Sequence, residues 1–156
     1  MRGARGEIVA DLHPEHVSPF VHALRDEFYL SPTALVEAIA LRTSFNLVHL
    51  ATAFKVDIFL PKDRPFDTAQ MQRSRAEVLD AATGRMARFA SAEDTLLAKL
   101  AWYASGGEQS ERQWRDVLGI VATQGAALDW NYMREMATTL DVGDLLVRLR
   151  DQAGLA

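Results

Sequence analysis

A single aspartate interrupts an apolar run that has the character of a buried strand. Asp57 lies in the segment FNLVHLATAFKVDIFLPKDRPF, residues 45–66, where it alternates with Val56, Ile58 and Leu60. An ionised carboxylate that leaves water without partners loses much of its solvation energy, so a sequence usually keeps one there for a cation, a metal or a hydrogen-bond network. Asp57 is therefore the first candidate for a functional residue.

Lys99 is the second candidate, because it lies at the border of the apolar face of an expected helix. Thr95, Trp102 and Tyr103 lie one turn away from it. In one interpretation the stem is buried and the ammonium group reaches a groove, where it contacts phosphate. In the other, the lysine covers apolar surface with its stem and keeps its charge in water. The residues alone leave both interpretations open.

The composition limits the other chemistry that the chain can carry. The 156 residues contain no cysteine, which excludes disulfides, thiolate metal sites and a cysteine nucleophile. Neither common type of glycine-rich phosphate loop is present, which argues against a kinase or a Rossmann site. We interpret the four histidines as surface residues rather than as metal ligands. They are His13, His16, His22 and His49.

Size and charge favour one ordinary domain. With 49% hydrophobic residues, the chain is long enough to bury a proper core. A net charge of -4 argues against a protein that coats nucleic acid, since phosphate binding usually requires a clustered basic surface. The sequence shows neither an apolar segment typical of a signal peptide nor a run of membrane-spanning length, so we expect a cytoplasmic protein without membrane contact.

The periodicity of apolar residues predicts strands and helices in the first part of the chain. EIVADL, residues 7–12, reads as a short strand, and helices are expected over 13–28 and 31–42. Residues 44–50 and 54–61 are rich in strand-forming residues and predict an antiparallel hairpin. We expect these three strands to share one sheet.

The last part of the chain is predicted to be mostly helical. Two short strands, 76–81 and 85–90, are joined by a turn that contains Gly84. Four helices follow, and three of them are expected to begin after a capping residue. These predicted caps are Ser91, Asp129 and Asp141. The order of strands and helices indicates an α+β fold.

Three segments together resemble a family of small bacterial proteins with the nucleotidyltransferase fold. They are EIVADL, the segment around Asp57, and ASAEDTLLAKLAWYASGGEQSERQWRDVLGI at residues 90–120. The resemblance implies a mixed sheet with helices over residues 1–90, and a helical region over 91–156 that packs on it as one compact unit. It also implies three strand carboxylates that hold two Mg²⁺ ions on a nucleoside triphosphate, and Asp57 matches the third of them.

The chain departs from the family pattern at the other two carboxylates. Arg5 occupies the first position and Glu7 the second. The Gly-Ser strand and helix that come before them in the family have no counterpart in a sequence that begins at Met1. The resemblance thus implies an N-terminally truncated or diverged member. In it, Glu7 and Asp57 are the candidate catalytic and metal-binding residues, and Lys99 is the candidate contact for nucleotide phosphates.

Two functions follow from this resemblance. The first is a module that has lost nucleotidyl transfer and binds a nucleotide such as ATP or a protein partner, as toxin-antitoxin relatives of the fold would. The second is an active metal-dependent nucleotidyltransferase that moves a nucleoside monophosphate to a hydroxyl group. Arg5 favours the first, because a cation cannot bind a metal. We also expect a homodimer, since the strand at residues 7–12 would lack a neighbour on one side.

Overall fold

The computed structural model describes residues 5–155 and confirms an α+β fold. The chain divides into two units, Met1–Asp63 and Arg64–Ala156. This division lies earlier in the chain than the expected one at residues 90 and 91. Residues 64–90, which form a helix and a two-stranded hairpin, belong to the second unit together with the later helices. Each unit is described below by itself.

The first unit is built on a four-stranded sheet with the strand order β1-β4-β3-β2. β1 pairs with β4 in parallel, and the other two pairs are antiparallel. The expected hairpin is present, and the prediction that it shares one sheet with a strand near residues 7–12 is confirmed, although that strand ends at Val9. The bounds are Arg5–Val9 for β1, Phe28–Tyr29 for β2, Ser44–His49 for β3 and Lys55–Phe59 for β4.

Two helices cover one face of this sheet. A 3-10 turn, Pro14–His16, leads into α1, Val17–Leu24, and α2 spans Pro32–Leu41 behind the Ser31 cap. Their apolar residues pack with alternate residues of β3 and β4, as strand periodicity requires. The buried members of this core are Leu35, Ala38, Ile39, Phe45, Leu47, Val56, Ile58 and Leu60.

The helix predicted over residues 13–28 was wrong at its end. α1 stops at Leu24, and Phe28 lies in strand β2 opposite His49. The Phe28 and His49 rings lie 5.1 Å apart between centroids. Tertiary pairing with β3 therefore overrides the helical pattern in this segment.

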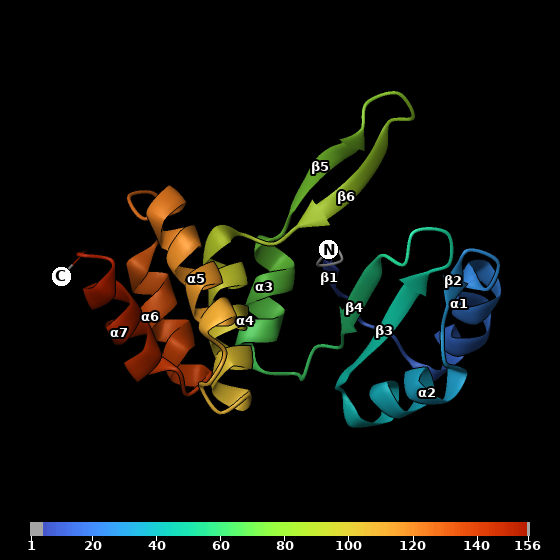
Figure 1. The fold of residues 1–156 in the computed structure, drawn as a ribbon, viewed down its shortest axis with the longest axis horizontal. Coiled ribbons are helices and arrows are strands. Elements are labelled where there is room, and N and C mark those ends of the chain that lie inside the picture. The colour runs from blue at the N-terminus through green and yellow to red at the C-terminus, as the bar shows by residue number, and fades with distance from the viewer. Residues whose placement is uncertain (1–4, 156) are drawn as a thin grey trace. The chain divides into compact units, whose positions relative to one another are not determined.

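The second unit contains five helices among the described residues. Figure 1 shows α4 to α7 side by side. Their core includes the predicted apolar stripes, with Leu96, Leu100 and Val117 fully buried. The helices are α3 (Pro65–Arg73), α4 (Ala92–Ser105), α5 (Glu111–Gln124), α6 (Trp130–Thr139) and α7 (Gly143–Gln152).

Two features of these helices differ from the sequence predictions. α3 was not predicted, although Pro65 at its first position and Asp67 in its first turn are common signals of a helix start. Asp141 is not the cap of α7, because the N-cap is Val142. Asp141 instead adopts a positive φ of 57° in the turn before the helix. The caps predicted at Ser91 and Asp129 are confirmed.

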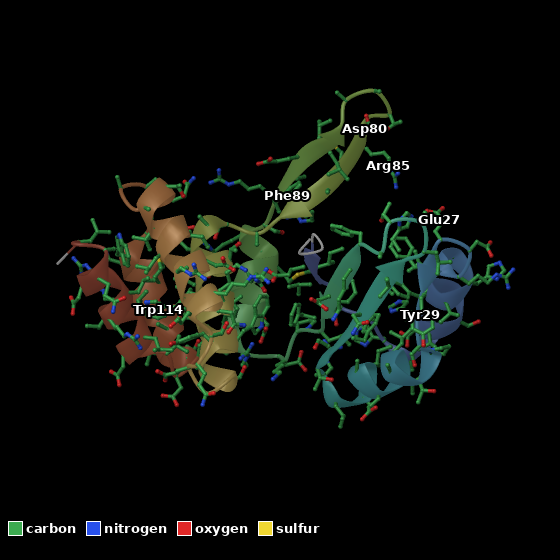
Figure 2. All side chains as sticks on the ribbon, in the orientation of Figure 1. Glu27, Tyr29, Asp80, Arg85, Phe89 and Trp114 are labelled. Carbon is green, nitrogen blue, oxygen red and sulfur yellow. The ribbon has the colours of Figure 1, made fainter. Side chains whose placement is uncertain are left out.

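A separate two-stranded hairpin connects α3 with α4 (Figure 1). β5 spans Arg75–Asp80 and β6 spans Arg85–Phe89, as the sequence predicted within a few residues. The strands pair with each other and not with the sheet of the first unit. Figure 2 shows Asp80 and Arg85 toward the tip of the hairpin and Phe89 at its base.

Candidate functional site

Asp57 lies on the face of the sheet opposite to the α1–α2 layer. The alternation of β4 directs Val56 and Ile58 into the core and Asp57 away from it. The Asp57 side chain keeps 21% of its surface exposed, so the expectation of a buried strand holds for one face of β4 only. The Lys55 ammonium nitrogen lies 3.4 Å from an Asp57 carboxylate oxygen. Asp57 thus already has a cation beside it.

The structure brings Glu7 next to Asp57. The parallel register of β1 and β4 aligns Glu7 with Asp57 and Arg5 with Lys55. Residues aligned across neighbouring strands lie on the same face of a sheet, so both candidate carboxylates are on the face opposite the helices. Glu7 is exposed, while Asp57 is half-buried. Asn46 aligns with Asp57 from the other side, in β3.

These residues form a weak setting for a divalent metal. Mg²⁺ takes oxygen ligands at near-octahedral geometry, usually from carboxylates together with substrate phosphates. Within residues 5–155, no group of three or more His, Cys, Asp or Glu is placed to hold a metal ion. The Lys55 ammonium group also competes for Asp57. The described residues beside Asp57 thus supply two aligned carboxylates, fewer than the three that the resemblance implies for a two-magnesium centre.

Lys99 belongs to the second unit, whereas Glu7 and Asp57 belong to the first. It lies in α4 and is half-buried, at the edge of the apolar face as predicted. Its ammonium nitrogen lies 5.8 Å from the centroid of the Trp102 ring, within the range of a cation–π contact. The aromatic neighbour fits a stem that packs on apolar surface, and the phosphate contact stays a prediction.

Arg42, which the sequence analysis did not single out, binds the segment that follows β1. Its guanidinium donates to the carbonyl oxygens of Pro61 and Leu12 and to the Asp11 carboxylate, at 2.7, 3.1 and 2.7 Å. The hydrogen bond from Arg42 holds the pKa of Asp11 below its usual value, with a smaller contribution from His13. Arg42 thereby joins the segments that follow β1, α2 and β4.

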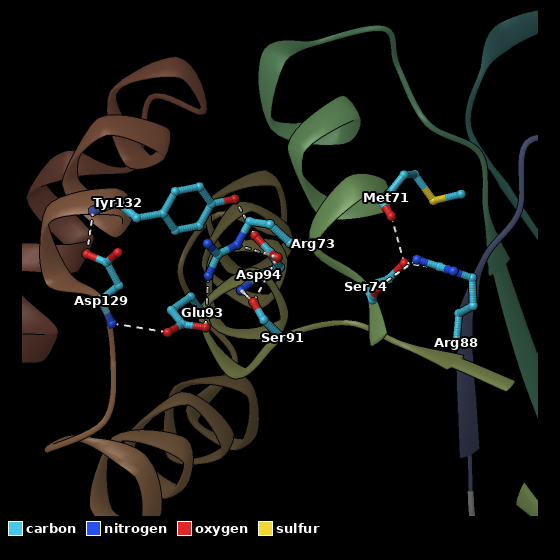
Figure 3. A network of polar contacts seen from close by, with 9 residues as sticks. All are labelled: Met71, Arg73, Ser74, Arg88, Ser91, Glu93, Asp94, Asp129 and Tyr132. Carbon is cyan, nitrogen blue, oxygen red and sulfur yellow. Dashed lines mark hydrogen bonds and ion pairs between the residues drawn. The ribbon is translucent and has the colours of Figure 1, made fainter. Parts of the chain in front are cut away.

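A buried polar network in the second unit was also missed. Asp94 is fully buried at the start of α4 and accepts hydrogen bonds from the hydroxyl groups of Ser91 and Tyr132 (Figure 3). Arg73, the last residue of α3, approaches Asp94 and Glu93 at 3.4 Å each. Its guanidinium carbon lies 3.9 Å from the centroid of the Tyr132 ring. The network joins α3, α4 and α6.

The network shifts the pKa values of two of its members. Burial raises the pKa of Tyr132 far above its ordinary value, and the hydrogen bond to Asp94 raises it further. Burial also opposes ionisation of Glu93, but the backbone N–H of Asp129 and the nearby Arg73 outweigh it and lower the pKa of Glu93. The two shifts favour an ionised Glu93 and a neutral Tyr132.

The sequence carried one signal of this network. Ser91 and Asp94 have the spacing of a capping box, and the Ser91 oxygen does accept the Asp94 N–H at 3.1 Å. The same Asp94 carboxylate also contacts Arg73 of α3 and Tyr132 of α6. Nothing in the spacing of these three residues along the chain indicates their contact.

No helix among the described residues is long and apolar enough to cross a membrane. Comparison of the chain with models of protein families, with curated proteins and with solved structures gave no match.

Proposed function

We propose that this chain is a binding module of the nucleotidyltransferase type that does not carry out nucleotidyl transfer. The motif resemblance around Asp57 and Lys99 suggests the type of fold. The α+β architecture, with Asp57 on a central strand and a helical part after it, is compatible with that type. The module would act by binding a nucleotide or a protein partner.

The observation that carries this proposal is the Lys55–Asp57 ion pair. The Lys55 ammonium nitrogen lies 3.4 Å from the carboxylate of Asp57, the residue that the resemblance assigns to the third metal-binding position. An ammonium group this close to Asp57 offsets the charge of its carboxylate and leaves less of it for a divalent ion.

An active metal-dependent nucleotidyltransferase is the second candidate. It is favoured by the alignment of Glu7 with Asp57, since two carboxylates side by side are the minimum for a shared metal. The missing acidic group at the position of Arg5 and the proximity of Lys55 count against it. We therefore assign no chemical step to a metal in this chain.

Turnover of labelled nucleoside triphosphates with magnesium or manganese separates the two candidates. We expect wild type to release no more pyrophosphate and to label no more acceptor than Asp57→Ala does. Transfer that requires a divalent ion and disappears in Asp57→Ala would establish the enzyme and refute the binding module. Asp26→Ala, a change at an exposed aspartate outside the sheet, is the matched control for the substitution.

Nucleotide binding through Lys99 is tested separately, by calorimetry with ATP and GTP. If its ammonium group contacts phosphate, Lys99→Ala removes the binding heat, whereas Lys99→Arg keeps most of it because the positive charge remains. Equal heats for wild type and Lys99→Ala would end the role of Lys99. Lys62→Ala, which removes an exposed lysine of the first unit, controls for a general loss of charge.

A further inference from the structure

The chain passes from the first unit to the second through a short segment between Leu60 and Phe66. Leu60 is 4% exposed and belongs to the core of the first unit, whereas Phe66 is 2% exposed and belongs to the core of the second. The two cores share no residue, and the boundary between the units follows Asp63. A change in the position of one unit relative to the other therefore requires rotation of the backbone between these two anchors.

Hydrogen bonds hold both ends of this segment. On the side of the first unit, the Arg42 guanidinium donates to the carbonyl oxygen of Pro61 at 2.7 Å. On the side of the second unit, Arg64 is the N-cap of α3, and its guanidinium donates to both Asp67 carboxylate oxygens at 2.7 and 3.1 Å. Paired hydrogen bonds between a guanidinium and a carboxylate fix geometry well. Pro61 is therefore attached to the first unit and Arg64 to the second.

Lys62 and Asp63 lie between these two held ends. Both residues are exposed, and no hydrogen bond or ion pair within the described part of the chain involves either of them. Asp63 has a positive φ of 58°, a conformation that few residues other than glycine, asparagine and aspartate adopt. Exposed backbone with few contacts needs the least free energy to change its dihedral angles. This two-residue stretch is therefore the easiest place for the chain to bend.

We propose that Lys62 and Asp63 form a hinge about which the two units change their relative position. Hinges of this kind consist of a few loop residues that absorb large changes of φ and ψ while the bodies on either side stay intact. The left-handed conformation of Asp63 suits this role, because its other allowed conformations have negative φ and redirect the chain. The hinge is independent of whether the chain binds or transfers nucleotides.

Distances between paired spin labels, measured by pulsed electron paramagnetic resonance, test the hinge. The chain contains no cysteine, so labels attach only where cysteines are introduced. The spanning pair is Glu37→Cys in α2 with Asp116→Cys in α5, and the control pair is Asp116→Cys with Asp144→Cys in α7. All three positions are exposed. We expect a broad distance distribution for the spanning pair and a narrow one for the control pair, which lies within the second unit.

Two substitutions at Asp63, made in the spanning pair, locate the bending. Asp63→Gly should broaden the distribution further, because glycine adopts positive and negative φ about equally well. Asp63→Pro should shift and narrow it, because proline fixes a negative φ and restricts the preceding Lys62. Glu108→Gly is the matched control, since Glu108 also has a φ of 58° but lies between α4 and α5. It should leave the spanning distribution unchanged.

Two outcomes would overturn the proposal. A spanning distribution as narrow as that of the control pair would mean that the two units form one rigid body. A spanning distribution that Asp63→Gly leaves unchanged, or that Glu108→Gly changes equally, would place the motion elsewhere in the chain. Circular dichroism establishes that each variant is folded. If Asp63→Pro does not fold, the comparison of Asp63→Gly with Glu108→Gly still decides the matter.

Discussion

Asp94 should be the most sensitive single position in the helical unit. Asp94→Ala removes a fully buried carboxylate and leaves the hydroxyl groups of Ser91 and Tyr132 and the guanidinium of Arg73 without their common partner. Hydrogen bonds to a charged group contribute roughly 1.5–3 kcal/mol each, so the two from Ser91 and Tyr132 together account for about 3–6 kcal/mol. The long 3.4 Å contact to Arg73 adds little. We expect a loss of about 3–6 kcal/mol in the free energy of unfolding.

The tryptophans make this loss measurable in one part of the chain. Trp102, Trp114 and Trp130 all belong to the second unit, so urea unfolding followed by their fluorescence reports that unit. Asp94→Asn keeps an oxygen acceptor without the charge and should lose about 1–3 kcal/mol. Asp116→Ala, at an exposed aspartate of α5, should stay within about 0.5 kcal/mol of wild type.

The ranking of these variants by their free energy of unfolding tests whether Asp94 stabilises the network. A loss of less than about 1 kcal/mol for Asp94→Ala, similar to an ordinary surface substitution, would refute the role assigned to it. Equal losses for Asp94→Ala and Asp94→Asn would show that the charge contributes nothing.

Two further predictions concern Tyr132 and Arg42. The raised pKa of Tyr132 contributes stability that is complete below its unfolded pKa of about 10 and is lost as the pH rises above it. Thermal unfolding between neutral and strongly alkaline pH should therefore show an alkaline loss that is smaller in Tyr132→Phe, and an equal loss in both would contradict the shift. Arg42→Ala should destabilise the first unit by about 1–3 kcal/mol and speed hydrogen exchange of the β4 amides, since three acceptors lose their donor. Arg42→Lys should recover part of the loss, and unchanged exchange in Arg42→Ala would exclude the fastening role.

Alternating or helical periodicity with standard caps was enough to predict most of the elements. The hairpin around Asp57 and the helix after Ser91 follow from one-dimensional patterns, because each pattern coincides with a buried face. The helix predicted over 13–28 was wrong at its end because Phe28 pairs with His49 of β3, a contact that is distant in sequence. α3 was missed although Pro65 marked its start, because its residues show no strong apolar stripe.

The sequence also placed Asp57 and Glu7 on one face of adjacent strands, and the register agrees. It missed Lys55 as the partner of Asp57, although residues two apart in a strand share a face and lie within reach of each other. The Arg73, Asp94 and Tyr132 contacts could not be foreseen, because they depend on how three helices pack. Polar contacts between residues that are distant in sequence leave no regular spacing from which they could be predicted.

Manganese titration of the first-unit carboxylates tests the central claim most directly. Water-proton relaxation or calorimetry, recorded for wild type, Asp57→Ala and the Asp26→Ala control, measures whether Glu7 and Asp57 hold a divalent ion without any assumption about substrate. Because Lys55 lies 3.4 Å from Asp57, we predict binding no tighter than millimolar and the same in all three proteins. Micromolar binding in wild type and in Asp26→Ala that is abolished in Asp57→Ala would contradict the account.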